Sequence, residues 1–225
     1  MKILILLKRV VNKLQNEGLK KTLTGVTTYM YDRYFDAKYQ IDTYNWVSKE
    51  DLIVEGAVAE HASLYQATRV LPLRKLFKIL NLDKNTVLMD IGSGKGRVLL
   101  VASEFNFKEV RGIEFSSNLC KIAIKNIENY KSKVVTETTF DIINIDASQY
   151  EFRDDESVIF MFNPFGDYIL NKVLKNIEMS LKRNERKLLI IYAYPVNRSL
   201  IEKNIPIKKI DNYKFWDMVF AVYEL

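Results

Sequence analysis

A glycine-rich segment that follows a continuous apolar run is the feature that most constrains the fold of this chain. The segment is Asp90-Ile-Gly-Ser-Gly-Lys-Gly-Arg97, and the apolar run before it covers residues 86–91. An apolar run that ends in an acid is typical of a strand buried on both faces of a parallel sheet. Glycines let the following loop turn sharply and let a ligand approach bare backbone. In an open α/β sheet this loop lies at the carboxyl edge, where ligands bind, so the sequence predicts a ligand site here.

The chain from about residue 68 onward continues this pattern of apolar runs and helical segments. We expect strands over 86–91, 109–114, 140–145, 157–162, 187–194, 207–210 and 218–223. We expect helices over 70–80, 97–105, 116–130 and 167–183. Such alternation implies a parallel sheet with helices on both faces. The predicted architecture is therefore an α/β domain over residues 61–225, with a seven-stranded, mostly parallel sheet.

Residues 1–60 lack this alternation, and we expect them to form a small N-terminal helical cap. Leu4, Leu7, Val11 and Leu14 recur at helical spacing among basic residues, and an aromatic-rich stretch follows at 29–46. A basic amphipathic helix either packs on its own domain or lies on an anionic membrane surface, so peripheral membrane contact stays open. The apolar start is too short for a signal peptide, and no stretch reaches the roughly 20 apolar residues of a membrane span. We expect a cytoplasmic protein.

Composition excludes several classes of chemistry. Cys120 and His61 are the only cysteine and the only histidine among the 225 residues. An intrachain disulfide and a Cys/His metal cluster are therefore excluded, and we expect no metal. The net charge of +6, from 34 Lys and Arg against 28 Asp and Glu, permits an anionic partner without requiring one. Because no strongly basic tail is present, a nucleic-acid partner is not expected.

The spacing of the glycines separates two kinds of ligand. Dinucleotide-binding loops follow the pattern G-x-G-x-x-G/A. Here the third glycine comes one position early, and Arg97 stands where Gly or Ala is needed. Pyrophosphate binding is therefore disfavoured. The loop instead suits a ligand that carries an ammonium group, which Asp90 would hold by a charge-assisted hydrogen bond.

Two further acids end the next two strands. Glu114 closes the strand at 109–114, where a carboxylate can accept both hydroxyls of an adenosine ribose, and Phe115 beside it would cover one face of the adenine. Asp146 follows the strand at 140–145, with Ala147 after it. Asp146 either accepts a hydrogen bond from the adenine amino group or simply caps a turn.

The segment Phe162-Asn-Pro-Phe-Gly166 ends the strand at 157–162. Backbone at the end of a buried strand is polar and must find partners, so an amide followed by proline is unusual there. Asn163 would lie where a nucleophile meets the reacting group of the ligand. The alternative is a structural turn, because Asn-Pro often opens turns.

The four segments DIGSGKG, GIE, NIDA and FNPF resemble, in order, the four motifs of the class I methyltransferases that use S-adenosylmethionine (SAM). The resemblance covers the chain from about residue 60 onward and implies a Rossmann-like fold with SAM as the cofactor. The segment DIGSGKGR and a Tyr upstream are similar to the non-SET protein-lysine methyltransferases. The layout also resembles small bacterial methyltransferases of polysaccharide gene clusters. FNPF departs from the [DNS]PP[YF] signature of amino-group methyltransferases, because Phe165 replaces the second proline, and this puts base methylation in doubt.

The resemblance also assigns roles to individual residues. Tyr65 and Thr68 lie in a stretch that folds over the methionine part of SAM in these families, and His61 and Asn163 are candidates for catalytic roles. The expected cofactor-binding residues are Tyr65, Thr68, Asp90, Gly92, Ser93, Gly94, Gly96, Arg97, Glu114, Phe115, Asp146, Ala147, Asn163 and Pro164.

The predicted activity is transfer of a methyl group to an oxygen or nitrogen acceptor, on a glycan or a small molecule. Two alternatives stay open: a protein-lysine methyltransferase, and a non-catalytic SAM-binding scaffold.

Overall fold

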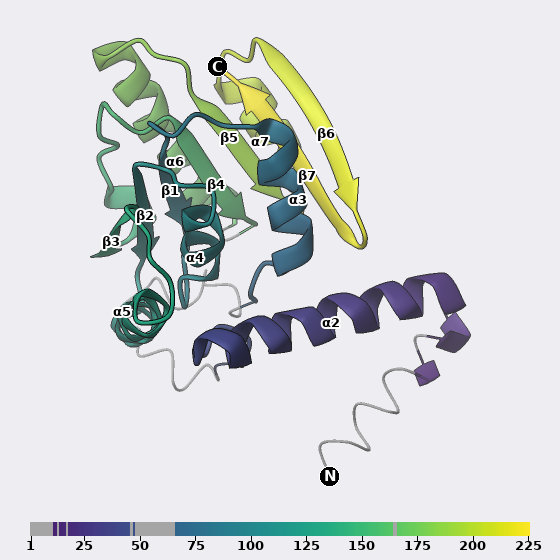
Figure 1. Cartoon of the computed structure of the whole chain (residues 1–225). Helices are drawn as coiled ribbons and strands as arrows, with labels where there is room; N and C mark the ends of the chain where they lie inside the picture. The colour runs from purple at the N-terminus through teal and green to yellow at the C-terminus, as the bar shows by residue number, and fades with distance from the viewer. Residues whose placement is uncertain (1–10, 13, 17, 46, 48–65, 164–165) are drawn as a thin grey trace.

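The computed structural model describes residues 11–12, 14–16, 18–45, 47, 66–163 and 166–225 (Figure 1). Its centre is one seven-stranded sheet in the order β3-β2-β1-β4-β5-β7-β6. The strands are β1 Val87–Ile91, β2 Glu109–Glu114, β3 Thr139–Asn144, β4 Val158–Phe162, β5 Leu189–Ala193, β6 Lys209–Phe215 and β7 Met218–Glu224. Only β7 runs against its neighbours β5 and β6. The predicted seven-stranded, mostly parallel, Rossmann-like sheet is confirmed.

Helices cover both faces of the sheet, as the alternation predicted. The helices are α2 Leu19–Tyr39, α3 Val70–Leu80, α4 Arg97–Ser103, α5 Ser117–Lys131, α6 Asp167–Arg183 and α7 Arg198–Asn204, with a 3₁₀ turn η2 at Ala147–Gln149. One hydrophobic core packs α2 to α5 against the sheet, and a second packs η2, α6 and α7 against the other face. All five residues of β1 are buried, as expected for a central strand with helices on both sides.

The chain order of the strands creates a crevice at the carboxyl edge. β1 pairs with β2 on one side and with β4 on the other, so the connections from these strands leave in opposite directions. In open α/β sheets ligands bind at this switch point. The glycine-rich loop after β1 therefore lies where the sequence predicted the ligand site.

The sequence predicted a helical cap over residues 1–60 without giving the bounds of its helices, and the structure places α2 at Leu19–Tyr39. Its inward face carries acids: Asp32 is fully buried and Asp36 is 7% exposed. These acids share the inward face with Phe35 and Tyr39, so they interrupt the apolar periodicity that sequence reasoning uses. Asp32 accepts a hydrogen bond from the backbone N–H of Val70 (3.0 Å), so α2 caps the start of α3. Figure 1 shows α2 along the edge at which β4 and β5 end.

The C-terminal part of the sheet also differs from the prediction. The sixth strand covers Lys209–Phe215 rather than 207–210, and the helix α7 was not predicted. β6 is an edge strand with polar residues on its exposed positions, so most of its length lacks the apolar residues by which a strand is predicted. The helix predicted to begin at residue 116 begins at Ser117. Ser116 is its N-cap and accepts a hydrogen bond from the backbone N–H of Leu119.

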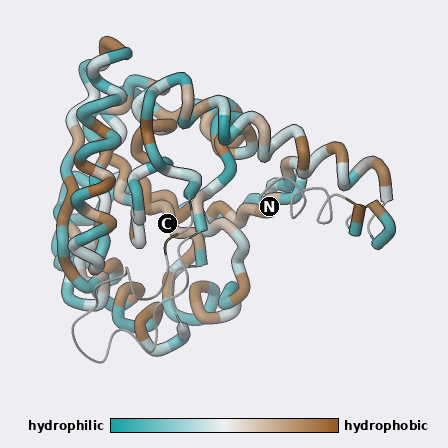
Figure 2. The backbone as a smooth tube through the Cα atoms, turned by 90° about the horizontal axis from the view of Figure 1, so that it is seen from below, coloured by the Kyte–Doolittle hydropathy of each residue, from teal (hydrophilic) through white to brown (hydrophobic). Residues whose placement is uncertain are grey.

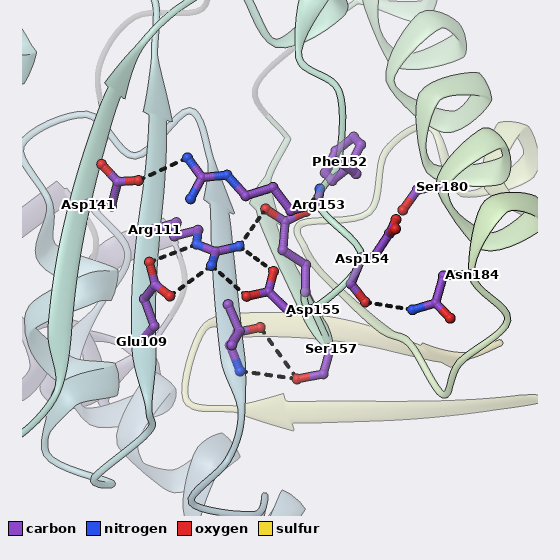
Figure 3. A network of polar contacts seen from close by, with 12 residues as sticks. Glu109, Arg111, Asp141, Phe152, Arg153, Asp154, Asp155, Ser157, Ser180 and Asn184 are labelled. Carbon is purple, nitrogen blue, oxygen red and sulfur yellow. Dashed lines mark hydrogen bonds and ion pairs between the residues drawn. The ribbon is translucent and has the colours of Figure 1, made fainter.

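A cluster of charged residues ties the sheet together at the opposite, amino end. Arg111 on β2 binds both carboxylate oxygens of Glu109 and both of Asp155, at 2.7–2.8 Å (Figure 3). Asp155 lies in the loop before β4, so the guanidinium links that loop to β2, on the other side of β1. This cluster has a structural role, because it lies away from the carboxyl edge.

Candidate functional site

The loop between β1 and α4 adopts a conformation that requires glycine. Gly92, Gly94 and Gly96 have φ angles of 77°, 54° and 82°, in the left-handed region that side chains disfavour. The backbone N–H groups of Gly92 and Ser93 both donate to the carbonyl oxygen of Ile113 on β2, at 2.9 Å. The loop is thus held against the second strand, with its backbone turned toward the carboxyl edge.

Gly112 on β2 makes room for this loop, and sequence reasoning did not single it out. A Cβ atom at this position would lie 2.6 Å from the Oγ of Ser93 and 2.9 Å from the side chain of Leu99. Real Cβ atoms do not approach other atoms so closely. The only signal in the sequence was the glycine inside the strand EVRGIE, which indicates a close approach of another segment.

Two carboxylates lie side by side at the ends of β1 and β2. Asp90 is 3% exposed and Glu114 is 4% exposed. Burial and, next, the charge of Glu114 raise the pKa of Asp90 well above its usual range. Within the described part of the chain no hydrogen bond reaches the Asp90 carboxylate. A buried acid in this state favours a cationic ligand, because a positive charge beside it would offset both effects.

Glu114 is held in place by backbone donors. Its two oxygens accept hydrogen bonds from the N–H groups of Gly94 and Ser116, each at 2.9 Å. Burial raises its pKa, and these hydrogen bonds act in the opposite direction. Because both of its oxygens are held by backbone donors, the Glu114 carboxylate has a fixed orientation beside the glycine loop.

Ser93 supplies a further polar atom. Its Oγ is buried and, among the described residues, finds no hydrogen-bond partner. Unpaired buried hydroxyls are uncommon in folded proteins and call for an explanation. This hydroxyl faces Gly112, where an added Cβ would lie 2.6 Å from it, so it is enclosed between the loop and β2.

The residues after β3 complete this side of the site. Asp146 caps the turn η2, and its Oδ1 accepts a hydrogen bond from the N–H of Ser148 (2.8 Å). Ala147 is buried, whereas Phe115 is partly exposed. The amide of Asn144 donates to the carbonyl oxygens of Glu114 and Phe115, at 2.9 Å each. The structure therefore shows the capping role of Asp146, and its contact with adenine stays a prediction.

Asn163, directly after β4, is held by a neighbouring strand. Its φ angle is 39°, and its Oδ1 accepts a hydrogen bond from the hydroxyl of Tyr192 on β5 (2.8 Å). The same hydroxyl accepts a bond from the backbone N–H of Asn197 (3.4 Å). Asn163 is thus fixed in a left-handed conformation that Asn tolerates better than most residues. Its catalytic role stays a prediction.

Two basic residues of the glycine loop and the start of α4 bind the N-terminal segment that contains α2. Lys95, 2% exposed, donates from its Nζ to the carboxylate of Asp42 (2.8 Å) and to the carbonyl oxygen of Asn45 (2.9 Å). Arg97, also 2% exposed, donates to the hydroxyl of Thr43 (2.7 Å) and pairs with Asp36 (3.3 Å). These basic side chains point to the cap, not to the phosphates of a ligand.

These hydrogen bonds involve two of the predicted cofactor-binding residues, Arg97 and Thr68. The guanidinium of Arg97 also donates to the backbone carbonyl of Thr68 (3.3 Å), and Thr68 is 3% exposed. In the structure both residues join the cap to the glycine loop, and their contact with a cofactor stays a prediction. His61, Tyr65 and Pro164 lie outside the described residues, so their predicted roles are not addressed.

A cavity of about 590 Å³ opens beside Phe162, the last residue of β4. It lies between α2, the segment 66–72, the ends of β4 and β5, and the β6–β7 hairpin. Its aromatic lining residues are Tyr29, Tyr44, Phe162, Tyr194 and Trp216. Its charged lining residues are Lys21, Arg69, Lys214 and Asp217.

Two of the aromatic residues adopt a conformation unusual for large side chains. Tyr194 and Trp216 have φ angles of 48° and 52°. The hydroxyl of Tyr194 donates to the carbonyl oxygen of Asp217 (2.7 Å), which fixes the hairpin tip against the end of β5. Backbone strain of this kind collects at functional sites, where the surrounding structure maintains it.

Two further observations concern the described residues. They contain no helix long and apolar enough to cross a membrane. They also contain no group of three or more His, Cys, Asp or Glu side chains able to hold a metal ion.

Comparison with known proteins identifies related families and folds. The family model described as "Histone methylation protein DOT1" matches residues 60–214. No curated protein matches the sequence.

Solved structures share the fold at low sequence identity. One is an RNA methyltransferase from Salinibacter ruber in complex with S-adenosyl-L-homocysteine: 15% identity, TM-score 0.52, covering 71% of this chain and 93% of that one. Another is the ribosomal protein L11 methylase of Lactobacillus delbrueckii subsp. bulgaricus: 12% identity, TM-score 0.52, covering 71% of this chain and 79% of that one. At this identity the likeness shows the fold alone.

Proposed function

The chain belongs to the DOT1 family of histone methylation proteins, and from this premise we propose that it is a SAM-dependent methyltransferase whose acceptor binds in the cavity between α2 and the β6–β7 hairpin. The observation that carries the proposal is the pair of buried carboxylates, Asp90 and Glu114, beside the glycine loop. These groups fit SAM, which has an ammonium group and a ribose but no phosphate.

Each polar group of this site has a partner on SAM. Asp90 would hold the ammonium group, and Glu114, already oriented by Gly94 and Ser116, would accept the ribose hydroxyls. Phe115, Asp146 and Ala147 would surround the adenine. SAM when bound supplies a methyl group already activated on a positively charged sulfur.

The role left to the protein is mainly alignment. Asn163 directly follows Phe162, which lines the cavity, and is held by Tyr192, so it would orient the acceptor atom. In-line alignment of two bound reactants supplies a large part of the rate enhancement in such transfers. A general base is needed only for an acceptor that arrives protonated, and His61 stays the predicted candidate for that role.

The cavity favours a glycan or small-molecule acceptor. Its volume of about 590 Å³ lies within the roughly 300–1,000 Å³ of pockets that enclose drug-sized ligands. A single extended lysine side chain would leave most of this space unfilled. Exposed aromatic faces such as Trp216 suit stacking on a sugar or another ring, and Lys21 and Lys214 suit an acceptor that carries negative charge.

A protein-lysine acceptor is the second candidate, and the family match favours it. The two acceptors differ in how they use the β6–β7 hairpin. A ring-shaped acceptor would lose a stacking surface in the variant Trp216→Asn, because Asn keeps the left-handed turn but has no aromatic face. We expect this variant to raise the KM of a glycan or small-molecule acceptor about fivefold or more, as loss of a ring contact worth about 1 kcal/mol or more implies.

Calorimetric titration with SAM and with S-adenosylhomocysteine tests the cofactor site directly. We expect micromolar binding by the wild type and loss of binding in Asp90→Ala and Glu114→Ala. The control is Asp154→Ala, an exposed carboxylate that pairs with Arg183 far from the loop. A folded wild type that binds neither molecule would refute the methyltransferase proposal. Binding without turnover on any glycan, small-molecule or lysine acceptor would favour the non-catalytic scaffold.

A further inference from the structure

The helix α2 has both a mixed inward face and an apolar outward face. Its inward face carries Phe35 and Tyr39 in the core together with the polar residues Thr22, Thr28, Asp32 and Asp36, all at most 7% exposed. Its outward face carries an apolar stripe of Leu19, Leu23, Val26, Met30 and Tyr34, which are 37–63% exposed. These five residues are spaced by three or four positions, so they lie along one side of the helix. The chain keeps its buried acids paired and leaves its leucines uncovered.

Scattered exposed apolar residues are ordinary, but a continuous row is not. Contiguous apolar patches on soluble proteins mark surfaces that bind a partner or a membrane. Val11 and Leu14, just before α2, are also exposed, at 49% and 42%. Figure 2 shows α2 extending past the body of the molecule, with hydrophobic residues recurring along it. Its N-terminal half is therefore accessible from outside the sheet.

The charges around the stripe have one sign. Arg33 and Lys38 on α2 are exposed, whereas the helix's two carboxylates, Asp32 and Asp36, are buried in ion pairs with Arg69 and Arg97. The exposed face of α2 is thus apolar and cationic. This combination is complementary to an anionic lipid surface, which takes apolar side chains into the headgroup boundary and attracts Lys and Arg. Two copies of the same face would bring like charges together.

We propose that α2 docks the protein on anionic membranes through the stripe Leu19, Leu23, Val26, Met30 and Tyr34. The stripe adjoins the acceptor cavity, because Val26 and Met30 also line that cavity. Docking would therefore bring the cavity mouth to the lipid surface and give access to acceptors held there. The binding itself does not depend on methyl transfer.

Co-sedimentation of the full chain with vesicles tests this surface. The probes are vesicles of phosphatidylcholine alone and vesicles that also contain phosphatidylserine. We expect binding to the anionic vesicles that weakens as salt rises. The double variant Leu23→Gln/Met30→Gln should lower the partition coefficient at least tenfold. Its matched control, Ile124→Gln/Met179→Gln, changes side chains of similar exposure on α5 and α6 and should bind as the wild type does.

A charge variant separates the electrostatic part. Removal of two cations in Arg33→Gln/Lys38→Gln should weaken binding about 30-fold, since each is worth about 1 kcal/mol near an anionic surface. Failure of the wild type to bind anionic vesicles would overturn the proposal. So would self-association in light scattering that depends on Leu23 and Met30 without vesicle binding, because that result would make a second copy the occupant. Calorimetric titration of the same samples with SAM separates the two proposals, because vesicle binding tests the docking surface and SAM binding tests the methyltransferase site.

Discussion

Replacement of Asp36 by alanine should destabilise the protein by about 3–5 kcal/mol, the usual cost of leaving one partner of a buried ion pair alone. Asp36 and Asp32 balance the charges of Arg97 and Arg69 in a cluster between α2 and the glycine loop. In Asp36→Ala the guanidinium of Arg97, 2% exposed, keeps only Asp32 at 3.4 Å as a carboxylate partner. The cluster then holds one uncompensated positive charge.

Lost hydrogen bonds add to this cost. Asp36 also accepts bonds from the backbone N–H groups of Thr43 (2.8 Å) and Tyr44 (2.7 Å) and from the Thr43 hydroxyl (2.6 Å). Arg97→Met should cost less, because Asp36 keeps these three donors and Asp32 keeps Arg69 and the N–H of Val70. The double variant Asp36→Ala/Arg97→Met restores charge balance. Its loss should fall short of the sum of the single losses by about 1–3 kcal/mol.

Urea unfolding followed by circular dichroism measures the free energy of unfolding of the wild type and these three variants. Lys125→Ala serves as the control, because Lys125 belongs to an exposed pair on α5 whose removal should change nothing measurable. A loss below about 1 kcal/mol for Asp36→Ala, or strictly additive losses in the double variant, would refute the charge-balance reasoning.

Three further predictions concern the site itself. The pKa of Asp90 is raised by burial and by Glu114, so the folded protein should become more stable as pH falls from this raised pKa toward the ordinary range of an aspartate. The variant Asp90→Asn should raise the melting temperature at neutral pH and make it depend less on pH. It should also abolish SAM binding. Gly112→Ala should cost about 1–3 kcal/mol and weaken SAM binding, because its Cβ would lie 2.6 Å from Ser93 Oγ, whereas Gly166→Ala, with nothing within 4 Å of its Cβ, should be neutral in both assays. Burial and the nearby Glu114 raise the pKa of Cys120 to about 12, so the thiol should react with a disulfide reagent at pH 8 only in denaturant, and rapid reaction of the native protein would show that the thiol is accessible.

Much of the site could be predicted because it depends on local sequence. β1, the glycine loop and α4 are contiguous, and the positive φ angles of Gly92, Gly94 and Gly96 follow from their residue type. The acids at 90 and 114 were placed together because parallel neighbouring strands end at the same edge of the sheet. The family match over residues 60–214 covers the same part of the chain.

The sequence by itself determined the α/β alternation, the ligand edge and the acids that face it, because each of these follows from periodicity or from one short segment. Only the tertiary structure decided what Lys95 and Arg97 do. Their partners Asp42 and Asp36 come from more than 50 residues earlier in the chain, and nothing in the local pattern links them. The same holds for α2, which buries its acids and exposes its leucines. Buried acids interrupt the apolar periodicity of its inward face, so the place of this helix in the fold became evident only from the residues packed against it.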